Sequence, residues 1–284
     1  VGASYKLIGR DQELRVIRAC LDSNKNLLIE GPVGVGKTHL AISACNDLKR
    51  KFFRIDGDGR YSEQKMTGWF DPPLVMKKGF KKEAFIEGPL VQAMLEGGVL
   101  FINELNRLPE GVQNVLLPAI DEKFITVPRY GTVRAKEGFV VLATQNPKEF
   151  VATSHLSEAI LDRFELIKLP YQSENEEADI VFQKTTQIKN IDRRLIAAAV
   201  RLVRTTRSHP KIRRGASVRA AISLVEITAA LSHKGINARD AFFKAVTIAL
   251  PTRIEVEQDV DPEKLLLDIA EEHYLESSTE KKKN

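Results

Sequence analysis

The residues from Gly31 to Thr38 have the types and the spacing needed to bind a chain of phosphates. Their order, Gly-Pro-Val-Gly-Val-Gly-Lys-Thr, fits the pattern G-x-x-x-x-G-K-[ST] in full. Glycines let successive backbone N–H groups point inward around an anion, and the start of a following helix adds a favourable dipole. Lys37 would bring a point charge to the β- and γ-phosphates, and Thr38 a hydroxyl to Mg²⁺. The sequence therefore predicts a site for ATP or ADP with Mg²⁺.

The predicted nucleotide-binding residues fill this loop and extend into the segment after it. They are Gly31, Pro32, Val33, Gly34, Val35, Gly36, Lys37, Thr38 and His39. An apolar strand-like run comes directly before the loop, and a helix-like segment begins at His39. A phosphate-binding loop requires this order of strand, loop and helix, which a chance glycine-rich turn would not reproduce.

A second polar cluster follows the apolar run Val99–Ile102. Glu104 is placed to polarise an attacking water, and the residue before it is usually an Asp that orients Mg²⁺. Asn103 stands there instead, and an amide keeps an oxygen acceptor but lacks the negative charge that Mg²⁺ prefers. We predict Thr38 and Asn103 as metal ligands, with weakened metal binding and slow turnover. The amide is either a tolerated natural variant or an engineered change that traps nucleotide; if its missing charge is the defect, Asn103→Asp should raise turnover.

Two further positions could act on the phosphates. Asn146 ends the apolar run that begins at Phe139, and an Asn at such a strand tip can hold the attacking water and the γ-phosphate. The dipeptide Asn-Pro also simply starts turns. Arg163 ends a helix-like segment just before another apolar run. Taken alone, it could be an ordinary arginine that interacts with the dipole at a helix C-terminus.

The elements that must position these residues can be read from the apolar pattern. Short apolar runs alternate with helix-like segments, which is typical of a buried parallel sheet. These runs lie at 26–30, 52–55, 98–102, 139–143 and 164–168. After these runs, apolar residues recur only at helical spacing, without further strand-like runs. These segments are 176–187, 191–206, 217–233 and 238–249. We predict an α/β P-loop NTPase core with a five-stranded parallel sheet over 1–170, a small all-α lid over 171–275 and a disordered tail over 276–284.

The composition limits the classes of function. The chain has 284 residues, a formal net charge of +5 and a pI near 9.1, which permits nucleic-acid contact but does not require it. It shows no apolar stretch of membrane-spanning length and no secretory leader pattern. Cys20 and Cys45 lie in apolar-periodic segments and are predicted to be buried free thiols, as in the reducing cytoplasm. No Cys/His spacing suggests zinc.

Taken together, these motifs resemble the MoxR family of AAA+ ATPases. The matching stretches follow the family's order along nearly the whole chain. They are 31–38, Phe85–Leu90, Phe101–Arg107, Ala143–Pro147, Glu158–Phe164 and Gly215–Ala220. The resemblance implies an ATPase that forms a ring, usually a hexamer, and acts as a chaperone. Its client would be a partner protein that it remodels or matures, such as one with a von Willebrand factor A domain.

The resemblance also implies roles for single residues. Asn146 would be sensor 1, and Arg219 would be sensor 2, contacting nucleotide in its own subunit. Arg163 would be the arginine finger, reaching the γ-phosphate of the neighbouring subunit. Together with Glu104, these make up the predicted catalytic set. Arg107 is a weaker candidate for an arginine that acts on the nucleotide. It could instead form a structural or inter-subunit salt bridge.

Two insertions also resemble the family, and two other functions stay open. Trp69–Phe85 carries Lys77, Lys78, Lys81 and Lys82, and Lys123–Arg134 reads as a β-hairpin. Trp69 would either pack within its own loop or face a partner, and the lysines would be either solvated or partner-facing. One alternative function is a DNA-directed AAA+ ATPase. The other is a nucleotide-gated scaffold that barely turns ATP over, as Asn103 permits.

Overall fold

A computed structural model describes residues 7–47, 50–146, 156–188 and 191–279. The chain divides into two compact units, of which one spans Arg10–Pro170 and the other begins at Tyr171 and takes in Gly9. Each unit has its own apolar core, so each is described by itself. Among the residues searched, none of the helices combines the length and the apolar character that crossing a membrane requires.

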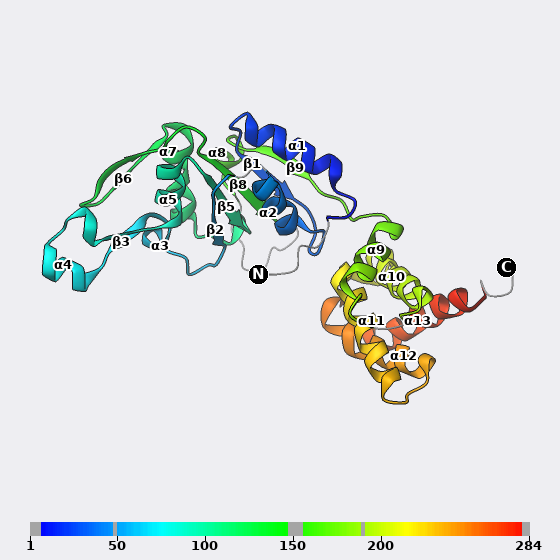
Figure 1. The fold of residues 1–284 in the computed structure, drawn as a ribbon. Helices are drawn as coiled ribbons and strands as arrows, with labels where there is room; N and C mark the ends of the chain where they lie inside the picture. The colour runs from blue at the N-terminus through cyan, green and yellow to red at the C-terminus, as the bar shows by residue number, and fades with distance from the viewer. Residues whose placement is uncertain (1–6, 48–49, 147–155, 189–190, 280–284) are drawn as a thin grey trace. The chain divides into compact units, whose positions relative to one another are not determined.

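The first unit is built on a five-stranded parallel sheet with strand order β2-β5-β8-β1-β9 (Figure 1). The predicted parallel sheet is confirmed. Its strands are β1 (Leu27–Glu30), β2 (Phe52–Asp56), β5 (Val99–Asn103), β8 (Val140–Gln145) and β9 (Glu165–Lys168). In β5 and β8 every residue except the last is buried, which explains why these strands read as unbroken apolar runs.

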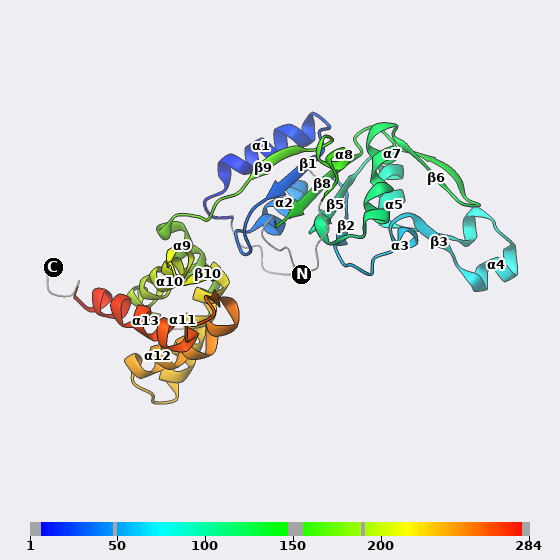
Figure 2. The ribbon, with the colours of Figure 1, turned by 180° about the vertical axis from the view of Figure 1, so that it is seen from behind.

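Helices pack on this sheet and close its apolar core (Figure 2). They are α1 (Asp11–Asp22), α2 (Lys37–Asp47), α3 (Glu63–Thr67), α5 (Pro89–Glu96), α6 (Glu110–Asn114), α7 (Leu116–Asp121) and α8 (Glu158–Leu161). The bounds of α5 follow from its sequence. Pro89 occupies its first turn, where the missing N–H costs nothing, and Gly97 ends it at φ +63°, a left-handed conformation that glycine adopts readily.

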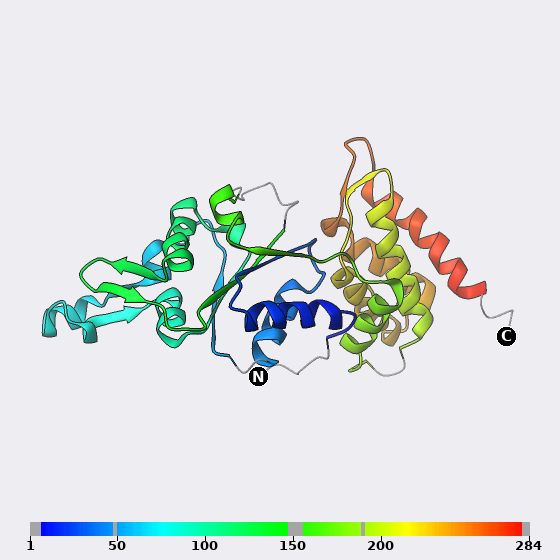
Figure 3. The same cartoon turned by 90° about the horizontal axis from the view of Figure 1, so that it is seen from above.

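The two insertions of this unit pack against each other. The first contains β3 (Gly68–Phe70), α4 (Pro72–Lys78) and β4 (Phe85–Glu87), and the second is the predicted hairpin, now confirmed, of β6 (Phe124–Val127) and β7 (Gly131–Arg134). The rings of Phe85 and Tyr130 lie 4.2 Å apart, and the guanidinium of Arg129 lies 4.2 Å from the ring of Phe80. Figures 1 and 3 both show the two insertions side by side. We call residues 68–87 and 124–134 the insert arm.

The second unit is mainly helical. The four predicted helices are present, with ends shifted by up to three residues: α9 (Glu174–Lys184), α10 (Arg193–Ser208), α11 (Val218–His233) and α12 (Ala238–Ala249). A fifth, α13 (Pro262–Thr279), was not predicted, and it includes residues 276–279 of the segment expected to be a disordered tail. The expectation of helices alone also missed a ribbon of β10 (Ile212–Arg214) and β11 (Glu255–Val256).

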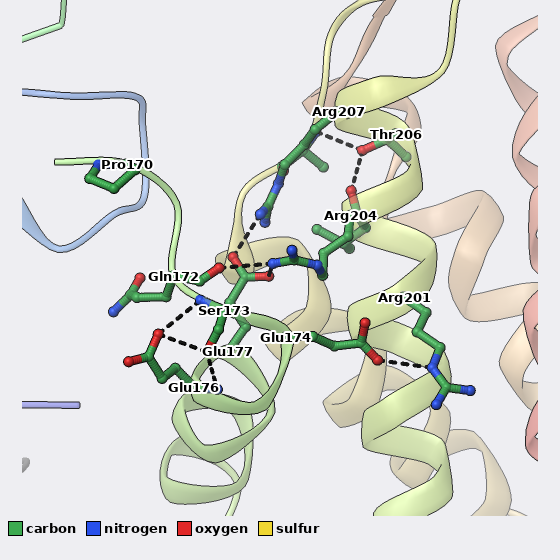
Figure 4. Close-up of polar contacts among 12 residues, drawn as sticks. Pro170, Gln172, Ser173, Glu174, Glu176, Glu177, Arg201, Arg204, Thr206 and Arg207 are labelled. Carbon is green, nitrogen blue, oxygen red and sulfur yellow. Dashed lines mark hydrogen bonds and ion pairs between the residues drawn. The ribbon is translucent and has the colours of Figure 1, made fainter. Parts of the chain in front are cut away.

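A buried ion-pair network joins α9 to α10 (Figure 4). The carboxylate of Glu177, whose side chain is 2% exposed, accepts hydrogen bonds from Arg207 Nη1 at 2.7 Å and from Arg204 Nη1 at 3.2 Å. Arg207 Nε also donates to the carbonyl of Ala216, and its guanidinium lies 4.0 Å from the ring centre of Tyr171. Glu177 therefore balances the charge of an arginine whose side chain is only 10% exposed.

The two cysteines differ in environment. Cys45 is buried, and this burial raises the pKa of its thiol to about 11, so the thiolate is scarce at neutral pH. Cys20 is only partly buried, which corrects the prediction of two buried thiols. It lies on α1, where neighbouring exposed residues leave one side of the helix open to solvent.

Replacing Glu177 should destabilise the protein much more than replacing its neighbour Glu174. Glu177→Ala leaves the Arg207 guanidinium buried without its counter-charge, and we expect a loss of about 3 kcal/mol in the free energy of unfolding. The control Glu174→Ala breaks a more exposed pair with Arg201 (side chains 45% and 29% exposed). That change should cost about 1 kcal/mol or less. Urea unfolding of the full chain checks both values, and equal losses would contradict the assigned role of Glu177.

Candidate nucleotide site

The glycine-rich loop connects the end of β1 to the start of α2 and has the backbone that phosphate binding requires. Gly34 and Gly36 have φ values of +84° and +87°, which residues with a Cβ rarely adopt. Helix α2 begins at Lys37, two residues earlier than predicted. Lys37 Nζ donates to the carbonyls of Gly31 and Pro32 at 2.6 and 2.8 Å, which holds the ammonium against the loop. The predicted binding residues thus form one continuous turn into a helix.

The ends of three strands meet beside this loop. Because the strands are parallel, their carboxyl ends share one edge of the sheet. Asn103, at the end of β5, accepts a hydrogen bond through its Oδ1 atom from Thr38 Oγ1 at 2.7 Å and another from Thr144 Oγ1, on β8, at 3.2 Å. The two predicted metal ligands, Thr38 and Asn103, are therefore in direct contact. Thr144, which is fully buried, was not predicted.

Asp56 is the other neighbour of Asn103 that the sequence did not single out. It ends β2, and it lies directly opposite Asn103 in the parallel register of β2 and β5. Asn103 Nδ2 donates to Asp56 Oδ1 at 3.1 Å. Arg54, two residues earlier on the same strand, holds this carboxylate with Nη2 at 2.7 Å from Oδ1 and Nε at 3.0 Å from Oδ2. The Asn103 amide therefore lies between the Asp56 carboxylate and the Thr38 hydroxyl and bonds to both.

Glu104 has an unusual backbone conformation. Its φ of +61° and ψ of +58° lie in the left-handed region, which is strained for a residue with a side chain. Its N–H donates to Thr144 Oγ1 at 3.0 Å, and its carboxylate forms an ion pair with Arg107 at 2.8 Å. The turn directs the chain from the strand into the short 3-10 helix Leu105–Arg107. The pair gives Arg107 the structural salt bridge that was one of its two predicted roles.

Asn146 follows β8 at the same sheet edge. It is buried, and its carbonyl accepts a hydrogen bond from Asn106 Nδ2 at 3.3 Å. The residue before it, Gln145, donates to Glu30 at the end of β1 at 2.8 Å. These bonds connect the ends of β1 and β8 and the turn after β5. Pro147, which completes the predicted motif, lies outside the described residues.

Arg163 lies at the opposite edge of the sheet. It comes just before β9, and its carbonyl accepts a hydrogen bond from Asn26, the residue just before β1. The phosphate loop follows the other end of β1, so the length of the parallel pair β1–β9 separates the two positions. Within its own chain Arg163 Nε donates to Asp121 at the end of α7, at 2.6 Å. The structure therefore does not bring Arg163 to the other predicted site residues.

Arg219 belongs to the second unit. It is an exposed residue in the first turn of α11, and its carbonyl accepts a hydrogen bond from Arg253 Nη1 at 3.2 Å. Arg213 and Arg214, on the ribbon strand before this helix, pair with Glu257 and Glu255. Arg219 is thus displayed on the surface of its own unit.

The donor set at the sheet edge suits a nucleotide with Mg²⁺. Hydroxyl and amide oxygens of Thr38 and Asn103 face each other, and such hard oxygen atoms are the ligands that Mg²⁺ prefers. Backbone N–H groups of the glycine-rich loop and the start of α2 suit phosphate oxygens. Across the described part of the chain, no cluster of three or more His, Cys, Asp or Glu side chains suits a tightly bound metal.

Comparison with known proteins places this core in a family. Residues 26–164 match the family profile described as AAA domain (dynein-related subfamily). An uncharacterized protein of Staphylococcus epidermidis is 32% identical over 219 residues, which cover 74% of this chain and 80% of that protein.

Solved structures share the fold at low sequence identity. NtrX from Brucella abortus, solved in complex with ADP, is 18% identical with a TM-score of 0.59, and the match covers 96% of this chain and 63% of that one. A RuvB mutant from Thermotoga maritima is also 18% identical, with a TM-score of 0.58 over 85% of this chain and 71% of that one.

Gly57 should tolerate no larger residue, because it lies against the strained turn at Glu104. Its N–H donates to the Asn103 carbonyl at 2.7 Å, and a Cβ at this position would collide with the carbonyl oxygen of Glu104. We expect Gly57→Ala to lower the free energy of unfolding by about 1–3 kcal/mol, as overpacking does. Gly59→Ala is the matched control, since a Cβ there meets open space. Thermal unfolding of both variants checks this. A Gly57→Ala protein that unfolds at the same temperature as the parent would contradict the prediction.

Proposed function

Since this chain belongs to the AAA family of ATPases, we propose that it binds ATP with Mg²⁺ and hydrolyses ATP to ADP and phosphate. We further propose a ring of MoxR type, a hexamer, that remodels or matures a partner protein. One observation carries the proposal: the phosphate loop and the ends of β2, β5 and β8 meet at a single sheet edge. On this proposal, Thr38 and Asn103 would supply the metal-side oxygens, and Glu104, the residue after Asn103, would supply the carboxylate that orients water.

The residues at this edge would divide the work of hydrolysis. The loop amides and Lys37 would hold the phosphates, and Thr38 and Asn103 would hold Mg²⁺. Bound Mg²⁺ would neutralise charge on the β- and γ-phosphates. Glu104 would orient the attacking water once its carboxylate leaves Arg107, and Asn146 would position that water from the neighbouring strand. Phosphoryl transfer needs mainly such positioning and charge stabilisation.

Arg163 supports action between subunits. It lies at the sheet edge opposite its own phosphate loop, so it is badly placed to act on its own nucleotide. An arginine finger supplied by a neighbour contributes about 10³–10⁵ in rate. We propose that Arg163 serves the adjacent subunit's site, and that Arg219 contacts nucleotide from the second unit of its own subunit.

The insert arm offers a surface for the partner protein. Trp69 and Met76 are 42% and 89% exposed, although large apolar side chains usually bury themselves. Exposed lysines at 77, 78, 81 and 82 follow Met76 in sequence. Trp69 pairs across the ribbon with Ile86, which is itself 38% exposed, so its own loop does not cover it. We propose that the arm binds an acidic protein surface through these residues.

Mixing two inactive variants should restore ATP hydrolysis if the arginine acts between subunits. Arg163→Ala should lower turnover about 10³-fold or more, because the transition-state charge loses its partner. Glu104→Gln should also stop hydrolysis while nucleotide still binds. In an equal mixture, an intact Glu104 meets a neighbour's intact Arg163 at about one interface in four, so a similar fraction of parent activity should return.

Phosphate release and nucleotide affinity, measured together, check that outcome. Lys37→Ala is the control: it should bind no nucleotide, and its mixture with Glu104→Gln should stay inactive, because neither subunit then has a working site of its own. A mixture that remains inactive while both variants bind nucleotide would rule out action between subunits. A parent protein that binds ATP tightly but never releases phosphate would instead support the scaffold alternative.

The partner surface can be tested with the ATP-holding form. Glu104→Gln protein with ATP should retain an acidic client, and a second change of Trp69→Ser and Met76→Ser should reduce the retained amount about tenfold or more, as loss of an apolar interface centre does. Ile248→Ser, at another exposed apolar side chain far from the arm in sequence, is the matched control and should change nothing. Equal retention by all forms would show that the arm does not carry the client.

A further inference from the structure

The hydrogen bonds of Asn103 identify a residue that the sequence pattern did not. We propose that Asp56 acts as a positioning residue for Mg²⁺: it fixes the orientation of the Asn103 amide and supplies, from the neighbouring strand, the negative charge that Asn103 lacks. The proposal rests on the proposed function, because it assigns the metal side of that same site. It starts from one observation, the contact of Asn103 Nδ2 with Asp56 Oδ1 at 3.1 Å.

Asp56 decides which way the amide faces. The two ends of an amide have nearly the same shape, and their hydrogen-bond partners determine which end is the oxygen. Thr38 and Thr144 are hydroxyls, which can donate or accept, so they would tolerate either orientation. An ionised carboxylate can only accept, so Asp56 requires the NH₂ group. The amide oxygen must then face Thr38 Oγ1, which lies 2.7 Å away.

The backbone keeps this arrangement in place. Asp56 and Asn103 are paired residues in the parallel register of β2 and β5, and the Gly57 N–H continues the ladder by donating to the Asn103 carbonyl at 2.7 Å. Two guanidinium nitrogens of Arg54 hold the carboxylate at 2.7 and 3.0 Å. Arg54 therefore limits the rotation of the Asp56 side chain, even though the Asp56 side chain is 59% exposed.

The same contact explains why a carboxylate need not stand at position 103. A hard cation held by Thr38 and Asn103 gains from a negative charge nearby, and Asp56 places one directly behind the amide, although its pair with Arg54 offsets part of that charge. A carboxylate at both positions would put two like charges at the present 3.1 Å contact, where they repel. Asn103→Asp alone is thus expected not to improve the site, which differs from the expectation drawn from the sequence alone.

Exchanging the two residues is the decisive experiment. Asp56→Asn leaves two amides and no charge, and Asn103→Asp leaves two carboxylates. The double variant Asp56→Asn with Asn103→Asp again has one amide and one carboxylate, with the hydrogen bond reversed. A fluorescent ATP analogue, titrated with Mg²⁺ for each protein, gives the Mg²⁺ concentration at half-saturation. Each single variant should need about tenfold more Mg²⁺ or more, as loss of a metal's supporting partner does, and the double variant should return close to the parent.

The controls separate this proposal from the proposed function. Asp58→Asn makes the same charge change two residues away and keeps the Oδ1 atom that accepts the Arg60 N–H, so it should behave like the parent. Binding of the analogue in EDTA should be the same in all five proteins, which shows an intact phosphate loop. Equal Mg²⁺ requirement in Asp56→Asn and the parent would overturn the role of Asp56 and leave the ATPase standing. A parent that binds no nucleotide would overturn both.

Discussion

The register between the parallel strands β2, β5 and β8 is the constraint on which the candidate site depends. These strands are far apart in sequence, yet their pairing places Asn103 between Asp56 and Thr144. Asn103 forms a hydrogen bond with each of them. Side chains alternate between the two faces of a sheet, so a slip of one residue would turn Asn103 away from Thr38. Leu100 and Ile102 point into the apolar core of this unit, so a slip of one residue would also move them out of it.

The backbone is strained at Glu104, directly after the paired strand β5. Glu104 leaves the sheet at a left-handed conformation, which costs on the order of 1–3 kcal/mol. Three contacts hold it there: its own N–H on Thr144, its carboxylate on Arg107, and the close approach of Gly57 to its carbonyl. At this turn the chain leaves β5 and enters the short 3-10 helix Leu105–Arg107, and the Glu104 carboxylate pairs with Arg107 at the end of that helix.

The sequence was sufficient for what is local and insufficient for what depends on pairing. The phosphate loop and the five strands could be predicted because glycine spacing and apolar runs are contiguous signals. Asp56 could not, since nothing in the order of residues says that β2 lies next to β5. The ribbon of β10 and β11 has strands of three and two residues, too short to show alternation. Helix α13 could have been found, because Asp261 caps its first turn just before Pro262 and apolar positions follow at helical spacing.

The position of Arg163 gives the proposed ring its physical reason. Its ion pair with Asp121 is partly exposed, with side chains 29% and 38% accessible, and such pairs contribute about 1 kcal/mol or less. An arginine on the transition state contributes about 4–7 kcal/mol. If Arg163 acts on a neighbour's phosphate as proposed, losing the Asp121 pair costs little against the gain in the transition state, whereas its own phosphate loop lies at the other end of the strands. On the proposed mechanism, a single subunit lacks one part of its active site, and closure of the ring supplies that part to every subunit at once.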